Sequence, residues 1–228
     1  MTPRPRVFPD RTAAGVALAQ ELQRRSLQPP LLVLGLPRGG VPVAYEVARV
    51  LHAPLDVMLV RKVGMPGQPE LAIGAIASGN IVVREPRIAK ELPELAASFA
   101  CLAEDERREL ERRDSAYRPQ LGPLELQGRT VILIDDGLAT GSTMLAAVRA
   151  ARQAGAAAIV VAAPVASPQA EKLVKAEADS VVILQTPAML FSIGEWYEQF
   201  EQLEDDEVRR LLDLQRRNQA AAPAGERR

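Results

Sequence analysis

The sequence predicts an α/β protein built on a doubly wound, mostly parallel sheet. Aliphatic runs bounded by turn residues alternate with segments of helical spacing, and the clearest runs are LLVLGL (31–36), VILI (131–134), AAIVVAAPVA (157–166) and SVVILQT (180–186). Continuous apolar strands are typical of a sheet that helices cover on both faces. Because strands and helices alternate, we expect βαβ units in one domain over residues 1–216, with a small added subdomain.

The first half of the chain predicts a helix, a strand, a second helix and a second strand. The opening helix is expected from about Arg11 to Arg25, with Asp10 as its N-terminal cap. After the first strand, GGVPVAYEVARVL (39–51) has helical spacing, and DVMLVR (56–61) is the second aliphatic strand. A glycine- and proline-marked segment, KVGMPGQPE (62–70), follows.

An insertion of about residues 64–125 separates the two halves. LAIGAIASGNIVVRE (71–85) predicts two short strands around a turn, and the alternating charges of AEDERRELERRD (103–114) predict a helix with one solvated face. The second half then alternates strands with two helices, MLAAVRAARQAG and PQAEKLVKAEA. Residues 217–228 lack apolar periodicity, and we expect a disordered tail there.

The composition argues against several classes of protein. A formal net charge of −1 gives no support for a general binder of nucleic acids or anionic membranes. One cysteine excludes an internal disulfide and suits a reducing compartment, and one histidine argues against a histidine-based zinc site or catalytic triad. The sequence also lacks an apolar run of membrane-spanning length and a signal-peptide core, so the cytoplasm is the expected compartment.

The stretch VILIDDGLATGSTM (131–144) carries the strongest functional signal. Asp135 and Asp136 follow a buried strand, and ligands of parallel sheets bind outside the carboxyl ends of the strands. The small residues beyond them precede a helix, whose N-terminus attracts anions. Carboxylates accept hydrogen bonds from sugar hydroxyls, so a phosphorylated sugar suits both halves of this stretch. Taken piece by piece, the same residues could equally be an ordinary turn and helix cap.

The contiguous order of four hydrophobic residues, an acidic pair and Thr-Gly-x-Thr resembles the signature of type I phosphoribosyltransferases. That family binds 5-phosphoribosyl 1-pyrophosphate (PRPP). The resemblance implies that Asp135 and Asp136 hold the ribose hydroxyls. It also implies that the following loop wraps the 5′-phosphate, with the contacts coming from Ala139, Thr140, Gly141, Ser142 and Thr143.

Two further segments match the family by position and character. In GLPRGGVPVA, four residues correspond to its pyrophosphate loop, namely Leu36, Pro37, Arg38 and Gly39. Arg61 and Lys62 resemble the Arg-Lys-x-Gly segment that opens the mobile loop of adenine phosphoribosyltransferases. An ordinary turn and a solvated charge pair remain the alternatives. Ala139 stands where hypoxanthine-guanine enzymes place an aspartate as proton acceptor, which argues against their usual mechanism.

The C-terminal segment TPAMLFSIGEWYEQF (186–200) resembles the region in which the family stacks an aromatic side chain on the base. Phe191 is the candidate for that contact, with Trp196 and Tyr197 behind it. Packing of a terminal helix would explain these aromatic residues equally well. By resemblance, this region is a small hood and the insertion at 64–125 contains a lid.

The implied reaction is Mg²⁺-dependent transfer of the 5-phosphoribosyl group of PRPP to a nitrogen nucleophile, with release of pyrophosphate. A purine-like base is the expected acceptor, and the residues implied to act in catalysis are Asp135, Asp136 and Arg38. Mg²⁺ would bind through PRPP and waters, so no protein metal site is expected. Members of the family often dimerise, so a homodimer is an expectation by resemblance. No nucleic acid or membrane partner is expected.

Two other functions compete with this interpretation. A protein of the same fold could bind PRPP and regulate without transferring anything, although regulators generally need a nucleic-acid surface that this sequence lacks. A dinucleotide binder would need G-x-G-x-x-G after the first strand, and GLPRGG has a different spacing. We rank the dinucleotide binder last.

Overall fold

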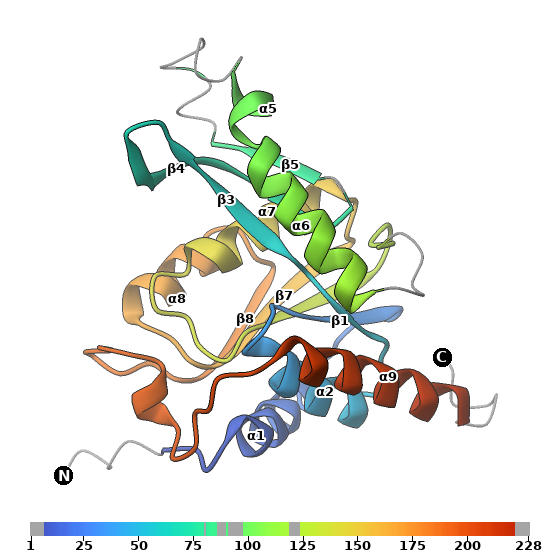
Figure 1. Ribbon diagram of the computed structural model, residues 1–228. Coiled ribbons are helices and arrows are strands. Elements are labelled where there is room, and N and C mark those ends of the chain that lie inside the picture. The colour runs from blue at the N-terminus through green and yellow to red at the C-terminus, as the bar shows by residue number, and fades with distance from the viewer. Residues whose placement is uncertain (1–6, 80, 86–89, 91–97, 119–123, 222–228) are drawn as a thin grey trace.

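The computed structural model describes residues 7–79, 81–85, 90, 98–118 and 124–221. Its centre is a five-stranded parallel sheet in the order β2-β1-β6-β7-β8 (Figure 1). The strands are β1 (Leu31–Gly35), β2 (Leu55–Val57), β6 (Thr130–Ile134), β7 (Ala158–Val165) and β8 (Ser180–Gln185). The predicted α/β fold with a parallel sheet is therefore confirmed, and the strand order places β1 beside β6.

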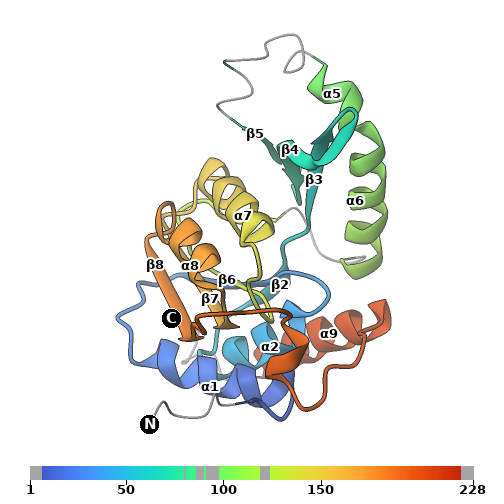
Figure 2. The ribbon, with the colours of Figure 1, turned by 90° about the vertical axis from the view of Figure 1, so that its left-hand side faces the viewer.

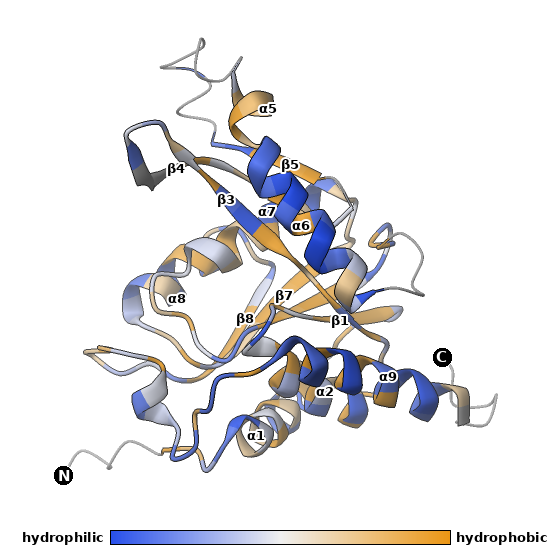
Figure 3. Cartoon of the chain, in the orientation of Figure 1, coloured by the Kyte–Doolittle hydropathy of each residue, from blue (hydrophilic) through white to orange (hydrophobic). Residues whose placement is uncertain are grey.

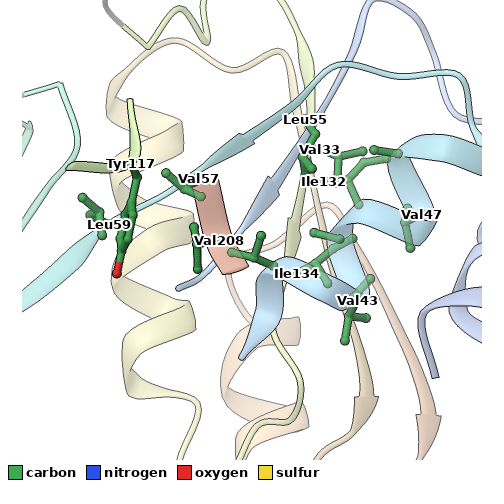
Figure 4. Packing of buried hydrophobic residues seen from close by; sticks show 14 of the residues in the cluster. Val33, Val43, Val47, Leu55, Val57, Leu59, Tyr117, Ile132, Ile134 and Val208 are labelled. Carbon is green, nitrogen blue, oxygen red and sulfur yellow. The ribbon is translucent and has the colours of Figure 1, made fainter. Parts of the chain in front are cut away.

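Helices cover both faces of this sheet (Figure 2). On one face lie α1 (Arg11–Gln23), α2 (Gly40–Val50) and α9 (Asp205–Ala221), and on the other lie α7 (Ser142–Gln153) and α8 (Pro168–Lys175). Neighbouring residues of each strand pack on opposite sides, because side chains alternate along a strand. Figure 4 shows Val33, Ile132 and Ile134 of the sheet against Val43 and Val47 of α2.

Local sequence explains where the helices begin. The Oδ1 atom of Asp10 accepts a hydrogen bond from the backbone N–H of Ala13 at 2.7 Å, which caps α1 as expected. Ser167 caps α8 in the same way through Ala170, and Pro168 occupies the first turn, where its missing N–H costs no hydrogen bond.

A second, antiparallel sheet lies between β2 and β6 in the sequence. Its strands are β3 (Val60–Met65), β4 (Gln68–Ala77) and β5 (Ile81–Arg84), and two helices follow, α5 (Phe99–Leu102) and α6 (Glu104–Tyr117). This hairpin subdomain, residues 60–118, projects from the body that contains the parallel sheet (Figures 1 and 2). Figure 3 shows the contrast between hydrophobic parallel strands and the largely hydrophilic α6.

The predicted strand at 56–61 is wrong in one respect, because two strands of different sheets share it. β2 ends at Val57 and β3 begins at Val60, and the glycine- and proline-marked residues 62–70 lie in the hairpin of β3 and β4. Met58 and Leu59 join the two sheets, and both are buried, each in a different hydrophobic cluster. Because both residues are apolar, the sequence shows no break between the two strands.

A buried ion pair fastens the hairpin subdomain to the parallel sheet. Arg118, just after α6, donates from Nε to Oδ1 of Asp56 at 2.9 Å and from Nη2 to Oδ2 at 3.0 Å. Burial raises the pKa of the Asp56 carboxyl, and the charge of Arg118 acts in the opposite direction. The pair therefore joins the end of α6 to β2. Without Arg118, a buried and unpaired carboxylate would destabilise the folded state.

The C-terminal helix α9 extends further than the expected domain boundary at 216, since it continues to Ala221. Val208, Leu211 and Leu212 of α9 are buried against α2 and the sheet. The remainder of the expected tail lies outside the described residues. None of the described helices is long and apolar enough to cross a membrane.

Candidate active site at the carboxyl ends of β1 and β6

The loops that follow β1 and β6 meet at one edge of the parallel sheet. In chain order the parallel strands are arranged 2-1-3-4-5, so the direction of winding changes between β1 and β6. In open α/β sheets this switch point forms the ligand crevice, because the two loops diverge to opposite faces. The N–H of Leu36 donates to the carbonyl of Ile134 at 2.8 Å, which holds the loops together at their start.

Two glycines let these loops approach closely. A Cβ atom at Gly39 would lie 2.0 Å from Oδ2 of Asp136, and one at Gly40 would lie 2.8 Å from Cα of Asp135. Since both distances are far below an ordinary contact, only glycine fits at either position without displacement. The first turn of α2 is thereby brought against the acidic pair.

The acidic pair is held by a hydrogen bond within the pair and by two contacts from distant parts of the chain. The N–H of Asp136 donates to Oδ1 of Asp135 at 2.9 Å, and Nε of Arg11 donates to Oδ2 of Asp136 at 2.9 Å. The hydroxyl of Tyr197 donates to the carbonyl oxygen of Asp136 at 2.6 Å. The Asp136 side chain is 13% exposed, so its carboxylate is fixed but still reaches the crevice.

Burial is the main influence on the ionisation of both carboxylates. It raises the pKa of Asp135, and the neighbouring charge of Asp136 raises it further. Burial also raises the pKa of Asp136, while the Arg11 guanidinium acts against that increase. Two partly dehydrated hydrogen-bond acceptors therefore stand side by side, which is an arrangement suited to the hydroxyls of a sugar.

The loop after the acidic pair leads into the N-terminus of α7. Gly141 adopts a φ of +75°, and a Cβ there would also lie 3.1 Å from Cα of Ala170, so the close turn requires glycine. The carbonyl of Ala139 accepts a hydrogen bond from Oγ of Ser167 at 2.7 Å, which ties the loop to the start of α8. The first N–H groups of α7 have no partner within the helix, and a helix start of this kind attracts anions through these groups and the helix dipole.

Hydroxyls and one lysine surround this helix start. The Oγ1 atom of Thr140 and the Oγ atom of Ser142 are 3.1 Å apart, and Nζ of Lys62 is 3.4 Å from Oγ of Ser142. Lys62 lies on β3, in the hairpin subdomain, rather than at the end of a parallel strand as expected. Its reach toward Ser142 nevertheless brings a positive charge to the start of α7.

Two cavities adjoin the crevice. The larger, of about 350 Å³, lies between the loop after β1 and residues 200–203; it is lined by Arg11, Arg38, Gly39, Asp136, Phe200, Glu201, Gln202 and Leu203. The smaller, of about 70 Å³, lies between the two loops and the hairpin subdomain; it is lined by Leu36, Pro37, Met58, Leu59, Val60, Arg61, Leu110, Arg113 and Thr143. The larger cavity therefore has both basic and acidic residues in its lining, whereas the charged residues of the smaller cavity, Arg61 and Arg113, are both basic.

The predicted cations face protein groups in this structure. Nη1 of Arg38 donates to the carbonyl of Leu203 at 2.6 Å, and its Nε lies 3.6 Å from Oδ1 of Asp205 at the start of α9. Arg61 forms an ion pair with Glu106 of α6 at 2.6 Å. Both arginines line a cavity, but each would have to exchange a protein partner for a ligand.

Phe191 does not lie where the base-stacking prediction needs it. Its side chain is 77% exposed on the loop after β8, and it lines neither of the two cavities. The aromatic ring at the larger cavity belongs to Phe200, which stacks on Tyr197 with ring centroids 5.0 Å apart. Trp196 and Tyr197 are buried beneath, as packing residues.

Sequence reasoning missed two site residues, Arg11 and Arg113. Arg11 contacts Asp136 across 125 positions of the sequence, and Arg113 reaches the smaller cavity from α6. Arg113 lies in the charged helix α6, and Arg11 is the first residue of the mostly apolar helix α1, so each resembles an ordinary solvated arginine. The sequence contains no local signal that would have separated them from neighbouring arginines.

The switch-point crevice, its acidic pair and its glycine-led helix start lie on a phosphoribosyltransferase fold. Residues 11–206 match the family model of the phosphoribosyl transferase domain, and the chain belongs to this family.

The relatives of the chain agree with this assignment. The chain is 43% identical over 219 residues to proteins of Mycobacterium tuberculosis, strains CDC 1551 and H37Rv, that are provisionally named phosphoribosyl transferases. The match covers 96% of this chain and 49% of those proteins, so the chain spans about half the length of the curated relatives it matches. The crystal structure of TT1426 from Thermus thermophilus is similar, with 42% identity, a TM-score of 0.83, and coverage of 90% of this chain and 97% of that one.

Proposed function

We propose that this chain transfers the 5-phosphoribosyl group of PRPP to a nitrogen nucleophile and releases pyrophosphate. The observation that carries the proposal is the placement of Asp135 and Asp136 at the β1/β6 switch point, beside the glycine-led start of α7. A ribose with a 5′-phosphate matches both features at once, since the carboxylates accept hydroxyl hydrogens and the helix start binds the phosphate.

The ribose would be fixed by the acidic pair and the phosphate by the loop of residues 139–143. Because the transition state of glycosyl transfer has oxocarbenium character, most of the new negative charge develops on the leaving group. The chain's own contribution is then to hold C1 in line with the nucleophile and to exclude water. No side chain needs to bond covalently to the sugar.

The pyrophosphate would lie toward the smaller cavity and the loop after β1. Arg61 and Arg113 line that cavity together with Thr143. Nζ of Lys62 lies 3.4 Å from Oγ of Ser142, the residue before Thr143. Cations placed where negative charge develops lower the barrier in a site from which water is excluded. Arg38 would join them by exchanging the carbonyl of Leu203 for a pyrophosphate oxygen.

Mg²⁺ fits this site as a part of the substrate. The ion usually keeps several waters and binds through substrate phosphates. Among the described residues, no group of three or more His, Cys, Asp or Glu could hold a metal, and Oδ2 of Asp136 already contacts Arg11. We therefore assign Mg²⁺ to the PRPP phosphates and water, where its charge would neutralise that of the departing pyrophosphate.

The larger cavity is the proposed position of the acceptor. It opens beside Asp136, and Phe200 in its lining gives a purine-like base an aromatic side chain to pack against. Ala139 offers no proton acceptor at the position used by hypoxanthine-guanine enzymes, so an acceptor that needs no such group, for example adenine, is favoured.

Pyrophosphate release from PRPP and Mg²⁺ tests this proposal. Adenine, hypoxanthine, guanine, other bases and simple amines are each supplied to the purified protein, and released pyrophosphate is measured with and without acceptor. Acceptor-dependent release that is lost in Asp136→Asn supports the transferase. Binding of PRPP with no release for any acceptor would instead indicate a PRPP-binding regulator.

A further inference from the structure

Arg11 is fixed on three sides beside the candidate site. Its side chain is 11% exposed, and its Nε donates to Oδ2 of Asp136 at 2.9 Å. Its Nη1 donates to the carbonyl of Glu201 at 3.0 Å. The guanidinium carbon also lies 3.8 Å from the ring centroid of Phe200, which is the geometry of a cation–π contact. A surface arginine would not have three independent partners of this kind.

The start of α1 is itself docked, so the position of Arg11 is set by the fold. Asp10 caps the helix immediately before Arg11. The N–H of Phe8 donates to the carbonyl of Trp196 at 2.9 Å, and the N–H of Glu198 donates to the carbonyl of Phe8 at 2.8 Å. The N-terminal segment and the segment after β8 are therefore joined directly beneath the acidic pair.

We infer that Arg11 is a positioning residue that holds the carboxylate of Asp136 ionised and in one orientation for the ribose hydroxyls of PRPP. The inference rests on the proposed function, since it concerns the ribose side of that site. Arginine suits the task because it keeps its charge at every accessible pH and its planar guanidinium fixes the direction of its hydrogen bonds. Nothing in the family signature at 131–144 includes this residue.

The physical reason is that burial favours the protonated form of Asp136, whereas the adjacent guanidinium favours the ionised form. An unpaired carboxylate away from water takes up a proton, and the neutral form accepts fewer hydrogen bonds. Burial raises the pKa of Asp136, and Arg11 is the largest influence against that increase. The other charged or titratable groups near it are Asp135 at the end of β6, Arg38 before α2, Tyr197 after the 3₁₀-helix η1 (Gly194–Trp196), and Glu201 across the larger cavity.

A first experiment measures the ionisation of Asp136 without any ligand. The carboxyl ¹³C resonances of the aspartates are titrated in the wild type and in Arg11→Gln, and Asp136→Asn assigns the resonance. Since the glutamine removes the opposing charge, we expect Asp136 to titrate at higher pH in this variant. Arg11→Lys, which keeps the charge, is expected to remain close to the wild type.

A second experiment measures PRPP binding by calorimetry over a range of pH with Mg²⁺ present. We expect Arg11→Gln to weaken binding by about tenfold to a hundredfold at neutral pH, as for a misplaced ligand group, and to lose binding at a higher pH than the wild type as the solution is acidified. Arg11→Lys should recover part of the affinity. Arg24→Gln, which removes an exposed charge near the other end of α1, should bind as the wild type does.

The outcomes separate this inference from the proposed function. If the wild type binds PRPP and Arg11→Gln binds it equally at every pH, the inference is wrong and the proposed function stands. A uniform loss of affinity with an unchanged titration of Asp136 would mean that Arg11 only joins the chain ends, and it would also overturn the inference. Failure of the wild type to bind PRPP would overturn both. Should Arg11→Gln unfold, Arg11→Met retains the packing on Phe200 and replaces it in both experiments.

Discussion

Replacing Gly39 with alanine adds one methyl group directly against the acidic pair. The backbone angles at Gly39, φ −59° and ψ −36°, suit any residue, so the substitution introduces no backbone strain. The new Cβ would lie 2.0 Å from Oδ2 and 2.5 Å from Cγ of Asp136, whereas ordinary contacts begin at 3.4 Å. The carboxylate or the loop must therefore shift by about 1 Å, a displacement that can reduce the effectiveness of a site by roughly a hundredfold.

We expect Gly39→Ala to weaken PRPP binding by about a hundredfold. Overpacking of this kind should also lower the free energy of unfolding by about 1–3 kcal/mol. Calorimetric titration with PRPP and Mg²⁺ measures the first quantity, and urea unfolding measures the second. The binding measurement is made at a temperature where the variant is fully folded, so that the two effects stay separate.

Gly128→Ala is a matched control for stability. Gly128 has a φ of +73° with no atom within 4 Å of an added Cβ, so alanine there costs only the left-handed backbone conformation, about 1–2 kcal/mol. It should therefore lose similar stability while PRPP affinity stays unchanged. If Gly39→Ala bound PRPP as tightly as the wild type, close contact between this loop and Asp136 could not be a requirement of the site.

Three further substitutions test other parts of the structure. The pKa of Asp135 is raised in the folded state, so its contribution to stability falls as pH rises from the unfolded-state pKa through the folded-state pKa. Asp135→Asn should therefore raise the melting temperature more at pH 7 than at pH 4, by about 2–4 °C for each kcal/mol gained. Equal changes in melting temperature at the two pH values would contradict this prediction. Arg118→Met leaves Asp56 buried and unpaired, so urea unfolding should show a loss of about 3–5 kcal/mol, part of which a second change, Asp56→Asn, should restore. Lys62→Gln should weaken PRPP binding by about tenfold through loss of one charged hydrogen bond, whereas calorimetry on the exposed-helix control Lys172→Gln should show no change.

Much of the fold follows from local pattern, since most of the parallel strands are aliphatic runs bounded by polar or turn residues. The runs at 131–134 and 157–166 correspond to β6 and β7 within one residue. The placement of the acidic pair at a sheet edge followed from the same pattern, because Asp135 ends such a run. Here a single segment contains the strand, the carboxylates and the helix start, so no long-range information was needed.

The features that sequence reasoning missed depend on contacts between distant segments. Arg11 and Asp136 come together only after α1 docks on the sheet and on the segment after β8. The strand at 56–61 was placed in one sheet because Met58 and Leu59 are apolar, although they join two sheets. Nothing in the residues themselves distinguishes a buried linker from a buried strand.

One missed element did have a local signal. Val208, Leu211 and Leu212 of α9 recur at helical spacing, and all three are buried. Their charged neighbours masked the pattern. No local signal distinguishes Phe191 from Phe200, because two phenylalanines on one C-terminal segment differ only in their positions in the folded chain.

Calorimetric titration with PRPP and Mg²⁺, repeated with Asp136→Asn, tests the ribose-phosphate site most directly. Saturable binding by the wild type that is abolished or strongly weakened in the variant is the predicted result, because the ribose hydroxyls lose a charged acceptor at the end of β6. Absence of binding by the wild type, or equal binding by Asp136→Asn, would contradict the assignment of this crevice to PRPP.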